Sequence, residues 1–330
     1  MVPVLDKNKN PLMPCSEKRA RKLLECKRAK PFWYKGFFTI ILQEDSSGNT
    51  MQDICVGLDP GSKMNGMTVK SESHTLLNLQ VKARCDVKEK VEKRAIIRRA
   101  RRRRNCPYRK CRIKRKGREM PPSTKTRWQQ HLNMVKLCSN LYPITHVSVE
   151  DVKAITKKHA RKWNVNFSPI EVGKSWFYSE LEKSYKLYTF GGYETYGERN
   201  ALGLKKSKNK LEKVFSAHCV DSWVLANKVI GGHVKPEYTK VIGVTPLIYY
   251  KRQLHVFLPV KGFRKKYGGT STFGIKKGTL VNSKRHGLSI IGGSARGGIS
   301  LHSLSDNKRF TQTAKKEELT VLTTLKFILK

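Results

Sequence analysis

The sequence predicts a mixed α/β protein with an all-β module near its C-terminus, and three observations lead to this. Apolar residues alternate with a period of two in residues 54–59 and 146–150, which is typical of β-strands. Residues 121–141 and 215–230 carry apolar side chains at helical spacing. Between residues 238 and 305, short apolar runs are separated by glycines, which predicts strands joined by turns.

The net charge of the chain demands a polyanionic partner. The 330 residues include 68 Lys and Arg but only 25 Asp and Glu, for a formal net charge of +43, and 38% are hydrophobic, enough to bury a core. No apolar run of 18 residues and no signal peptide is found, so we expect no membrane association. The charge is spread along the chain, unlike a short polybasic segment for lipid headgroups. We therefore expect a nucleic acid partner.

The first 45 residues predict a small unit. Residues 2–5 and 37–42 are strand-like, residues 11–14 suggest an apolar turn, and Ser16 can cap a basic helix that runs to about Leu24. The polar segment that follows is typical of a linker.

An arginine-rich stretch follows the strand predicted at residues 54–59. Residues 93–118 contain no acid, and we expect a helix at least through Arg104, broken or kinked at Pro107. The alternative is a merely solvated basic helix, but the stretch lies between two apolar units and carries arginines on every helix face. Arginine pairs bidentately with phosphate oxygens. The expected nucleic-acid-binding residues are Arg98, Arg99, Arg101, Arg102, Arg103, Arg104, Arg109 and Arg112.

The cysteines indicate a reduced, intracellular protein, since their spacing matches no secreted disulfide framework. Cys106 and Cys111 could form half of a zinc site, although no second pair at ligand spacing lies nearby.

Farther along the chain, we expect residues 151–175 to be irregular, residues 176–187 to be helical and residues 189–213 to form a loop. The aromatic residues Trp176, Phe177 and Tyr178 can either stack bases or pack in a helical core, and the helical spacing favours the core.

Four residues are candidates for catalysis. Asp59 and Glu150 each end an apolar strand, and Asp221 lies in an apolar helix three residues after His218, on the same helix face. Three carboxylates and a histidine suit Mg²⁺, and two such ions can activate water and stabilise the leaving oxygen of a phosphodiester. Each acid could equally form a turn or cap a helix, and the spacing alone does not establish a shared site.

These residues lie in segments that resemble known motifs. Residues 56–63, 147–150 and 218–221 are similar to the first, second and third motifs of RuvC-type nucleases, which have an RNase H-like fold. Pro11-Leu12-Met13-Pro14 resembles the N-terminal signature of IscB-like proteins, and Arg98-Arg99-Ala100-Arg101-Arg102 resembles the Arg-Arg-x-Arg-Arg segment that names the wider family.

Further similarities extend the match along the chain. Residues 202–207 resemble the approach to the third motif, and residues 267–269, 274–278 and 299–302 resemble the family's terminal β domain. Two departures are a stretched segment before the third motif and Ser222, where alanine is common.

The resemblance implies an RNase H-like RuvC core split in three, with an arginine-rich bridge helix, a small N-terminal domain and a C-terminal module resembling a small β-barrel. The expected divisions are a PLMP domain at 1–50, RuvC part I at 51–83, the bridge helix at 84–118, RuvC part II at 119–175, RuvC part III at 176–236, and at 237–330 a β domain that reads the motif beside the target.

The resemblance also implies a function, that of a transposon-encoded, RNA-guided DNA endonuclease. Only 67 residues separate Glu150 from His218, with one histidine, His159, and no cysteine, so an inserted HNH nuclease domain is missing. The chain therefore resembles the HNH-lacking IsrB branch, which implies nicking of one strand, the non-target strand.

The same resemblance assigns the site residues and partners. Asp59, Glu150 and Asp221 would hold two Mg²⁺ ions, with Mn²⁺ as a substitute, while His218 would orient or deprotonate water or act as a ligand. The implied partners are a guide (omega) RNA and target double-stranded DNA, bound by a monomeric protein in the nucleoid-associated cytoplasm of a prokaryote.

Two alternatives explain parts of the sequence. A non-catalytic protein that binds structured RNA accounts for the charge but not for three acids in the order of the RuvC motifs. A Holliday-junction resolvase accounts for those acids but has no use for a long acid-free helix or a separate β module.

Overall fold

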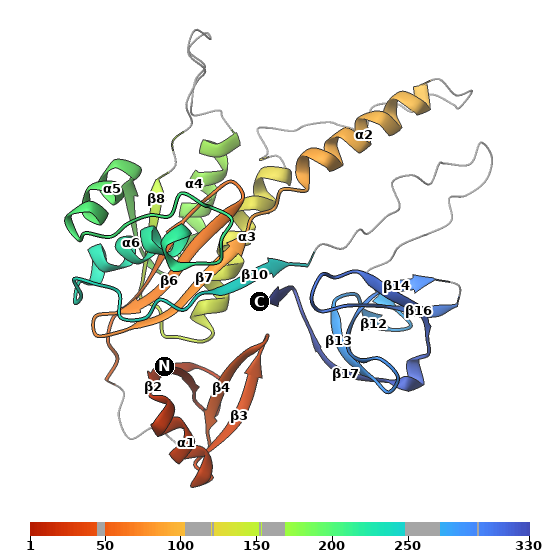
Figure 1. Cartoon of the computed structure of the whole chain (residues 1–330), viewed down its shortest axis with the longest axis horizontal. Coiled ribbons are helices and arrows are strands. Elements are labelled where there is room, and N and C mark those ends of the chain that lie inside the picture. The colour runs from red at the N-terminus through yellow and green to blue at the C-terminus, as the bar shows by residue number, and fades with distance from the viewer. Residues whose placement is uncertain are drawn as a thin grey trace. The chain divides into compact units, whose positions relative to one another are not determined.

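The computed structural model describes residues 1–44, 50–102, 120, 122–151, 153, 169–247, 271–295 and 297–330. The chain divides into two compact units, one of residues 1–84 with 117–244 and one of residues 85–116 with 245–330. Both strands and helices contribute to the first unit, which confirms the mixed α/β prediction (Figure 1).

The N-terminal segment of the first unit folds as a small sheet with one helix. Strands β1 (Val2–Leu5), β2 (Pro11–Cys15), β3 (Ala29–Tyr34) and β4 (Phe37–Leu42) follow the order β2-β1-β4-β3, and α1 (Glu17–Glu25) begins at Ser16, whose hydroxyl accepts a hydrogen bond from the Arg19 amide. Residues 11–14 were predicted to be a turn, and this is wrong. They form an edge strand, where a proline is tolerated because one row of backbone groups has no partner strand.

A second sheet carries the strands that end in predicted site residues. Strands β5 (Ile54–Asp59), β6 (Met64–Ser71) and β7 (Thr75–Lys82) are successive antiparallel neighbours. Strand β8 (His146–Asp151) is parallel to β5, β9 (Lys186–Gly191) is parallel to β8, and β10 (Ile242–Pro246) is parallel to β7. Their order is β10-β7-β6-β5-β8-β9. Parallel strands β5 and β8 therefore end at the same edge of the sheet.

Helices cover both faces of this sheet. A π-helical turn (Phe215–Cys219) leads into α6 (Val220–Ile230), and α6 packs on β5, β6 and β8. On β6, Thr68 hydrogen-bonds the Cys219 carbonyl oxygen, whereas the adjacent Met67 contacts Cys138 of α3 (Pro122–Ser139). Since successive strand residues point to opposite faces, α6 and α3 lie on opposite faces of the sheet.

Of the three aromatic residues of α4 (Pro169–Glu182), Phe177 belongs to the core, as the helical spacing predicted, and Trp176 and Tyr178 are partly buried. Phe177 is fully buried and stacks on Trp128 of α3, with ring centroids 5.1 Å apart. Tyr178 donates a hydrogen bond to Asp151, and Trp176 lies beneath the Lys125 ammonium.

Three predictions for this region are wrong in part. Helix α4 begins at Pro169, inside the segment expected to be irregular, and it ends at Glu182 rather than at residue 187. The expected loop 189–213 contains the end of β9 and the whole of α5 (Gly192–Ala201). Strand β9 is a partly exposed edge strand without a clear apolar alternation. The start of α5 is held by Glu194, whose carboxylate accepts a hydrogen bond from the Gly191 amide 2.6 Å away.

The described residues of the second unit, from 271 on, form strands as the sequence predicted, but β10, which also lies inside the predicted β module, pairs with β7 of the first unit. Strands β11 (Ser271–Thr272) and β12 (Ile275–Lys276) form a hairpin. A five-stranded sheet has the order β16-β15-β14-β13-β17, around a core of Val281, Ile291, Ile299, Leu301 and Ala314. Its strands are β13 (Thr279–Ser283), β14 (Gly287–Ala295), β15 (Gly298–His302), β16 (Arg309–Ala314) and β17 (Leu319–Thr324), and β18 (Phe327–Leu329) follows.

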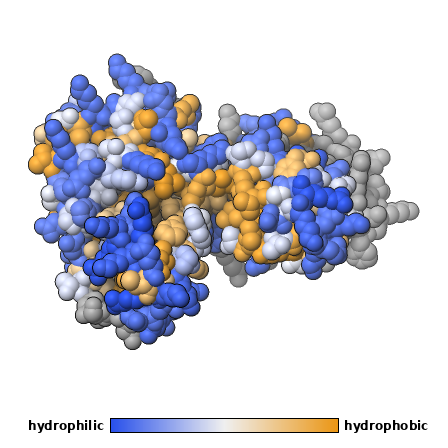
Figure 2. Space-filling view, turned by 60° about the horizontal axis from the view of Figure 1, so that its bottom comes forward, coloured by the Kyte–Doolittle hydropathy of each residue, from blue (hydrophilic) through white to orange (hydrophobic). Residues whose placement is uncertain are grey.

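This unit also contains α2 (Val87–Arg102), the described part of the predicted arginine-rich helix. The apolar run 254–260 lies outside the described residues. Figure 2 shows hydrophilic residues over much of the visible face, with hydrophobic residues gathered in patches among them. No helix within the described part of the chain is long and apolar enough to cross a membrane.

Substitution of Gly57 by alanine should destabilise the protein. A Cβ atom at Gly57 would lie 1.8 Å from the Ser222 carbonyl oxygen in α6, so helix and strand would have to separate. Overpacking of this kind costs about 1–3 kcal/mol of unfolding free energy. We expect Gly57→Ala to lower the thermal unfolding midpoint measured by circular dichroism.

The matched control is Gly197→Ala in α5, where a Cβ would meet no atom within 4 Å. Alanine favours a helix over glycine by about 0.5–1 kcal/mol, so this variant should be neutral or stabilised. Equal unfolding midpoints for Gly57→Ala and the unchanged protein would contradict the close packing of α6 on β5.

Candidate active site

Asp59 and Glu150 lie next to each other because of the strand register. Leu58 of β5 is paired with Val149 of β8, so the following residues, Asp59 and Glu150, meet at the end of both strands. Asp59 is 6% exposed. Parallel pairing thus brings together two acids that lie far apart in the sequence.

Helix α6 brings Asp221 to the same place, and glycines allow its close approach. Gly57 of β5 faces the Ser222 backbone, and Gly66 of β6 faces the His218 backbone, where a Cβ would lie 2.2 Å from the carbonyl oxygen. Without side chains at these positions the helix can lie directly against the strands. Asp221 is consequently 2% exposed.

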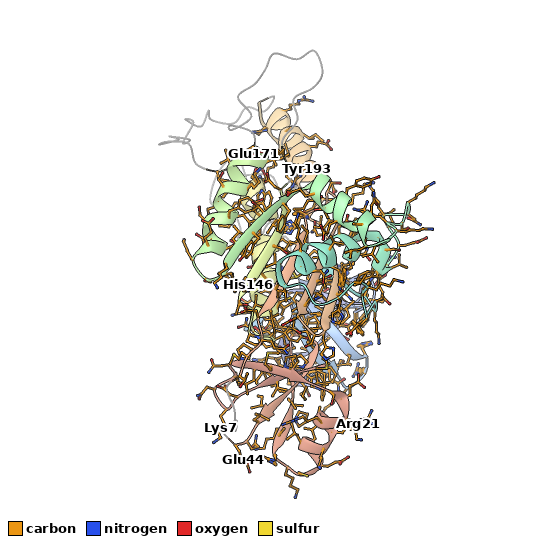
Figure 3. All side chains as sticks on the ribbon, turned by 90° about the vertical axis from the view of Figure 1, so that its left-hand side faces the viewer. Lys7, Arg21, Glu44, His146, Glu171 and Tyr193 are labelled. Carbon is orange, nitrogen blue, oxygen red and sulfur yellow. The ribbon has the colours of Figure 1, made fainter. Side chains whose placement is uncertain are left out.

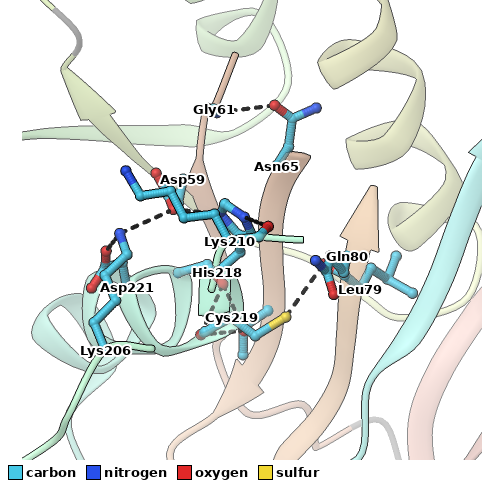
Figure 4. Close-up of polar contacts among 12 residues, drawn as sticks. Asp59, Gly61, Asn65, Leu79, Gln80, Lys206, Lys210, His218, Cys219 and Asp221 are labelled. Atoms are coloured by element: carbon cyan, nitrogen blue, oxygen red, sulfur yellow. Dashed lines mark hydrogen bonds and ion pairs between the residues drawn. The ribbon is translucent and has the colours of Figure 1, made fainter. Parts of the chain in front are cut away.

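His218 lies in the π-helical turn before α6. Its Nδ1 atom is 3.7 Å from Oδ2 of Asp59, and its Nε2 atom is 2.9 Å from the Lys210 carbonyl oxygen (Figure 4). The interaction with the Asp59 carboxylate is the main cause that raises the pKa of His218. Because Nε2 must donate to the carbonyl oxygen, Nδ1 is the nitrogen that exchanges a proton on the side of Asp59.

Two basic side chains neutralise Asp221. Arg199 of α5 contacts Oδ1 through Nη1 at 2.5 Å, and the Lys206 ammonium contacts Oδ2. The same ammonium is 3.9 Å from Oδ2 of Asp59, so Lys206 lies between two carboxylates (Figure 4). Although burial opposes its charge, Asp59 and Asp221 raise the pKa of Lys206.

Glu150 and Asp59 divide one negative charge between them. Burial, the hydrogen bond with Asp59 and the charges of Asp59 and Asp221 together raise the pKa of Glu150 to about 8. Burial also opposes the charge of Asp59, but His218 and Lys206 outweigh it and lower the pKa of Asp59. At neutral pH, therefore, Glu150 carries the proton and Asp59 the charge.

The donor set fits a hard divalent cation. Three carboxyl groups supply oxygen ligands, the type that such a cation prefers. As the described side chains stand, no group of three His, Cys, Asp or Glu residues is already arranged around a common metal position. Lys206 and Arg199 occupy the oxygens of Asp221 instead.

All four predicted catalytic residues thus come together, in one unit. His218 and Asp221 were predicted on one face of a regular helix, but the π-helical turn ends between them, and His218 reaches Asp59 while Asp221 reaches Arg199 and Lys206. Such π-helical turns occur often at functional sites.

The predicted nucleic-acid-binding residues lie elsewhere. Arg98 and Arg99 are on α2, in the second unit, and are exposed. For Arg101 and Arg102 only the helical backbone is described. Arg103, Arg104, Arg109, Arg112 and the candidate zinc ligands Cys106 and Cys111 lie outside the described residues.

Sequence reasoning missed Arg199 and Lys206. Lys206 falls in the segment 202–207, whose similarity to the approach to the third motif marked its position but not its role. Arg199 belongs to a helix in a region predicted to be a loop, so no pattern pointed to it.

The shared proton predicts a pH dependence of stability in protein kept metal-free with EDTA. The unfolded chain loses the Glu150 proton near pH 4.5, whereas the folded chain keeps it to about pH 8. Stability must fall as pH rises through this window, because the unfolded state binds fewer protons. We expect the fall in thermal midpoint from pH 5 to pH 8 to be smaller in Glu150→Gln.

Glutamine retains the hydrogen-bond donor to Asp59 but cannot ionise, so the difference between the two proteins reports the titration of the Glu150–Asp59 pair. The same slope of midpoint against pH in both proteins would contradict the raised pKa.

Comparisons with known proteins were made for sequence and structure. Residues 2–165 match the family model described as RRXRR protein. No curated protein matches. Among solved structures, Thermus thermophilus RuvC in complex with a Holliday junction substrate is 13% identical, with a TM-score of 0.27 over 55% of this chain and 97% of that chain. A second Thermus thermophilus RuvC structure is 14% identical, with a TM-score of 0.24 over 52% of this chain and 90% of that one.

Proposed function

We propose that this chain, whose residues 2–165 match the RRXRR family model, is an RNA-guided DNA endonuclease of the IsrB type that nicks one strand. The observation that carries the proposal is the convergence of Asp59, Glu150, Asp221 and His218 at one edge of a sheet. Buried acids with shifted pKa values cluster at functional sites, and in a chain with a net charge of +43 three of them in one place indicate such a site.

The strand arrangement supports an RNase H-like core. Strands β7, β6 and β5 are antiparallel neighbours, and β8 and β9 continue from β5 as parallel strands, in the order β7-β6-β5-β8-β9. Asp59 ends β5, Glu150 lies near the end of β8, and Asp221 lies on the later helix α6. The proposed core accounts for this combination of a mixed sheet with acids at two adjacent strand ends.

The site residues have distinct roles in the proposed reaction. Asp59, Glu150 and Asp221 would hold two Mg²⁺ ions, with Mn²⁺ as a substitute, and these ions supply a nucleophilic hydroxide and stabilise the leaving oxygen when bound. To act as a ligand, Glu150 would have to lose its proton to solvent, because only the carboxylate form binds a cation. His218 accepts a proton at Nδ1 from the attacking water, or orients that water, and the Lys210 carbonyl oxygen fixes its ring.

The basic surface supports the guide RNA and target DNA as partners. In RNA-guided nucleases base pairing supplies the specificity, and the protein recognises backbone and duplex shape. Arg98 and Arg99 on α2, with the other arginines of the bridge helix 84–118, would hold an omega RNA and its heteroduplex. The β domain expected at 237–330, apart from β10, which pairs with β7, would read a motif beside the target. A monomeric protein would thus work as part of a ribonucleoprotein at the nucleoid.

Asp59→Ala should abolish nicking while RNA binding persists. Removal of this carboxylate takes away a ligand and the partner of His218, which should cost at least about 10³-fold in rate. The measurement is nicking of a guided plasmid substrate in Mg²⁺, with RNA affinity measured in parallel. Asp53→Ala removes an exposed acid near the start of β5 and should leave both unchanged. Full activity of Asp59→Ala would refute the site.

The ribonucleoprotein should convert a matched supercoiled plasmid to the open circle and no further, because one nuclease centre cuts one strand. Strand-specific labels should locate the nick in the non-target strand. RNase treatment of the complex should abolish nicking, and the co-purified RNA should have a defined sequence with a variable guide end. A linear product would reveal a second centre, whereas RNA-independent cleavage of Holliday junctions would favour a resolvase.

A further inference from the structure

We propose that Tyr193 and Tyr196, one turn apart on α5, stack against bases of the single-stranded DNA that enters the site. The inference rests on the proposed nuclease function, and it adds a binding site for the strand that is cut. Both rings are unusually open, since Tyr193 is 79% exposed and Tyr196 is 58% exposed. The core of the unit uses neither ring, whereas Thr195, between them, is buried.

Tyr193 lies at the edge of the sheet where the acids meet. Glu150 of β8 is paired with Phe190 of β9, and α5 begins two residues later. A Cβ atom at Gly192 would lie 3.0 Å from Oε1 of Glu150, and one at Gly191 would lie 2.7 Å from the Tyr193 ring. Figure 3 shows Tyr193 at this end of the sheet, with His146 toward the other end.

Tyr196 is connected to the acids through Arg199. The guanidinium carbon lies 5.3 Å from the centroid of the Tyr196 ring, and the same side chain contacts Asp221. This cation–π contact orients the ring. Residues 193, 196 and 199 follow one another along one side of the helix, so a stripe runs from two open rings to a carboxylate of the site.

Exposed lysines lie close in sequence to the two tyrosines and supply the positive charge that proteins use to bind single-stranded nucleic acid. The segment after α5 carries Lys205, Lys208 and Lys210, all exposed, and it also brings Lys206 into the site. Proteins that bind single strands combine such charges, which follow the phosphates, with aromatic rings on which bases stack. A duplex keeps its base faces covered, so these rings suit an unpaired strand, which the proposed reaction supplies as the displaced strand.

The test separates stacking from charge, which a protein of net charge +43 applies to any polyanion. Full-length protein in EDTA is titrated with a DNA oligonucleotide and with an abasic oligonucleotide of equal charge. Loss of stacking weakens binding by about 5- to 150-fold for each base. We expect the dissociation constant of the abasic oligonucleotide to exceed that of the normal one by such a ratio. We also expect quenching of 2-aminopurine placed in the normal oligonucleotide.

The ratio should fall toward one in the double variant Tyr193→Ala with Tyr196→Ala, and it should persist in the matched Phe variant, which keeps both rings. Tyr188→Ala is the control. Tyr188 is 40% exposed on β9 but stacks on His146, away from the acids, so its loss should leave the ratio unchanged.

An unchanged ratio in the double alanine variant would overturn the proposal, as would a ratio found only with RNA oligonucleotides. The outcome is independent of cleavage. If Asp59→Ala still nicks DNA while the ratio depends on the two tyrosines, the catalytic assignment fails and the stacking site stands.

Discussion

The close approach of α6 to β5 is the constraint on which the candidate site depends. With glycine at positions 57 and 66, the backbone of the helix lies against the strands, and the buried residues of α6 cover the sheet. That contact sets the height of Asp221 above Asp59. The parallel pairing of β5 with β8 sets the lateral distance to Glu150. A larger residue at either glycine would move one acid relative to the others, while each strand and helix could still form.

The burial of three acids has an electrostatic cost that the rest of the site offsets. Burial, together with the neighbouring charges of Asp59 and Asp221, raises the pKa of Glu150 to about 8, so Glu150 retains its proton at neutral pH. Lys206 and Arg199 reduce the cost at Asp221, and His218 reduces it at Asp59. Positive charge at this position therefore stabilises the fold. A bound divalent cation would act in the same direction and would compete with Lys206 for the oxygens of Asp59 and Asp221.

The sequence predicted the parts of the site that follow from periodicity. Strands β5 and β8 alternate clearly, and α6 is apolar around most of its surface, so Asp59, Glu150 and Asp221 could be placed at element ends or on a helix. Strand β9 and helix α5 were missed because an exposed edge strand needs no apolar alternation and because glycines mark the start of α5. Arg199 and Lys206 were missed for the same reason, because Arg199 lies on α5 and Lys206 lies in the segment that follows it. Their pairing with Asp221 depends on long-range packing, which no local pattern encodes.

Charge and stacking answer different requirements of a nuclease that holds a flexible strand. Phosphate contacts supply affinity, but they are alike along the whole backbone, so a strand held by lysines and arginines alone can slide. Rings spaced one helical turn apart act on individual bases and define a register. Since Tyr196 shares Arg199 with Asp221, a base seated on that ring would fix the position of its own phosphate relative to the acids. In the proposed arrangement the basic surface would determine that a strand binds, and α5 would determine which of its phosphates faces Asp59.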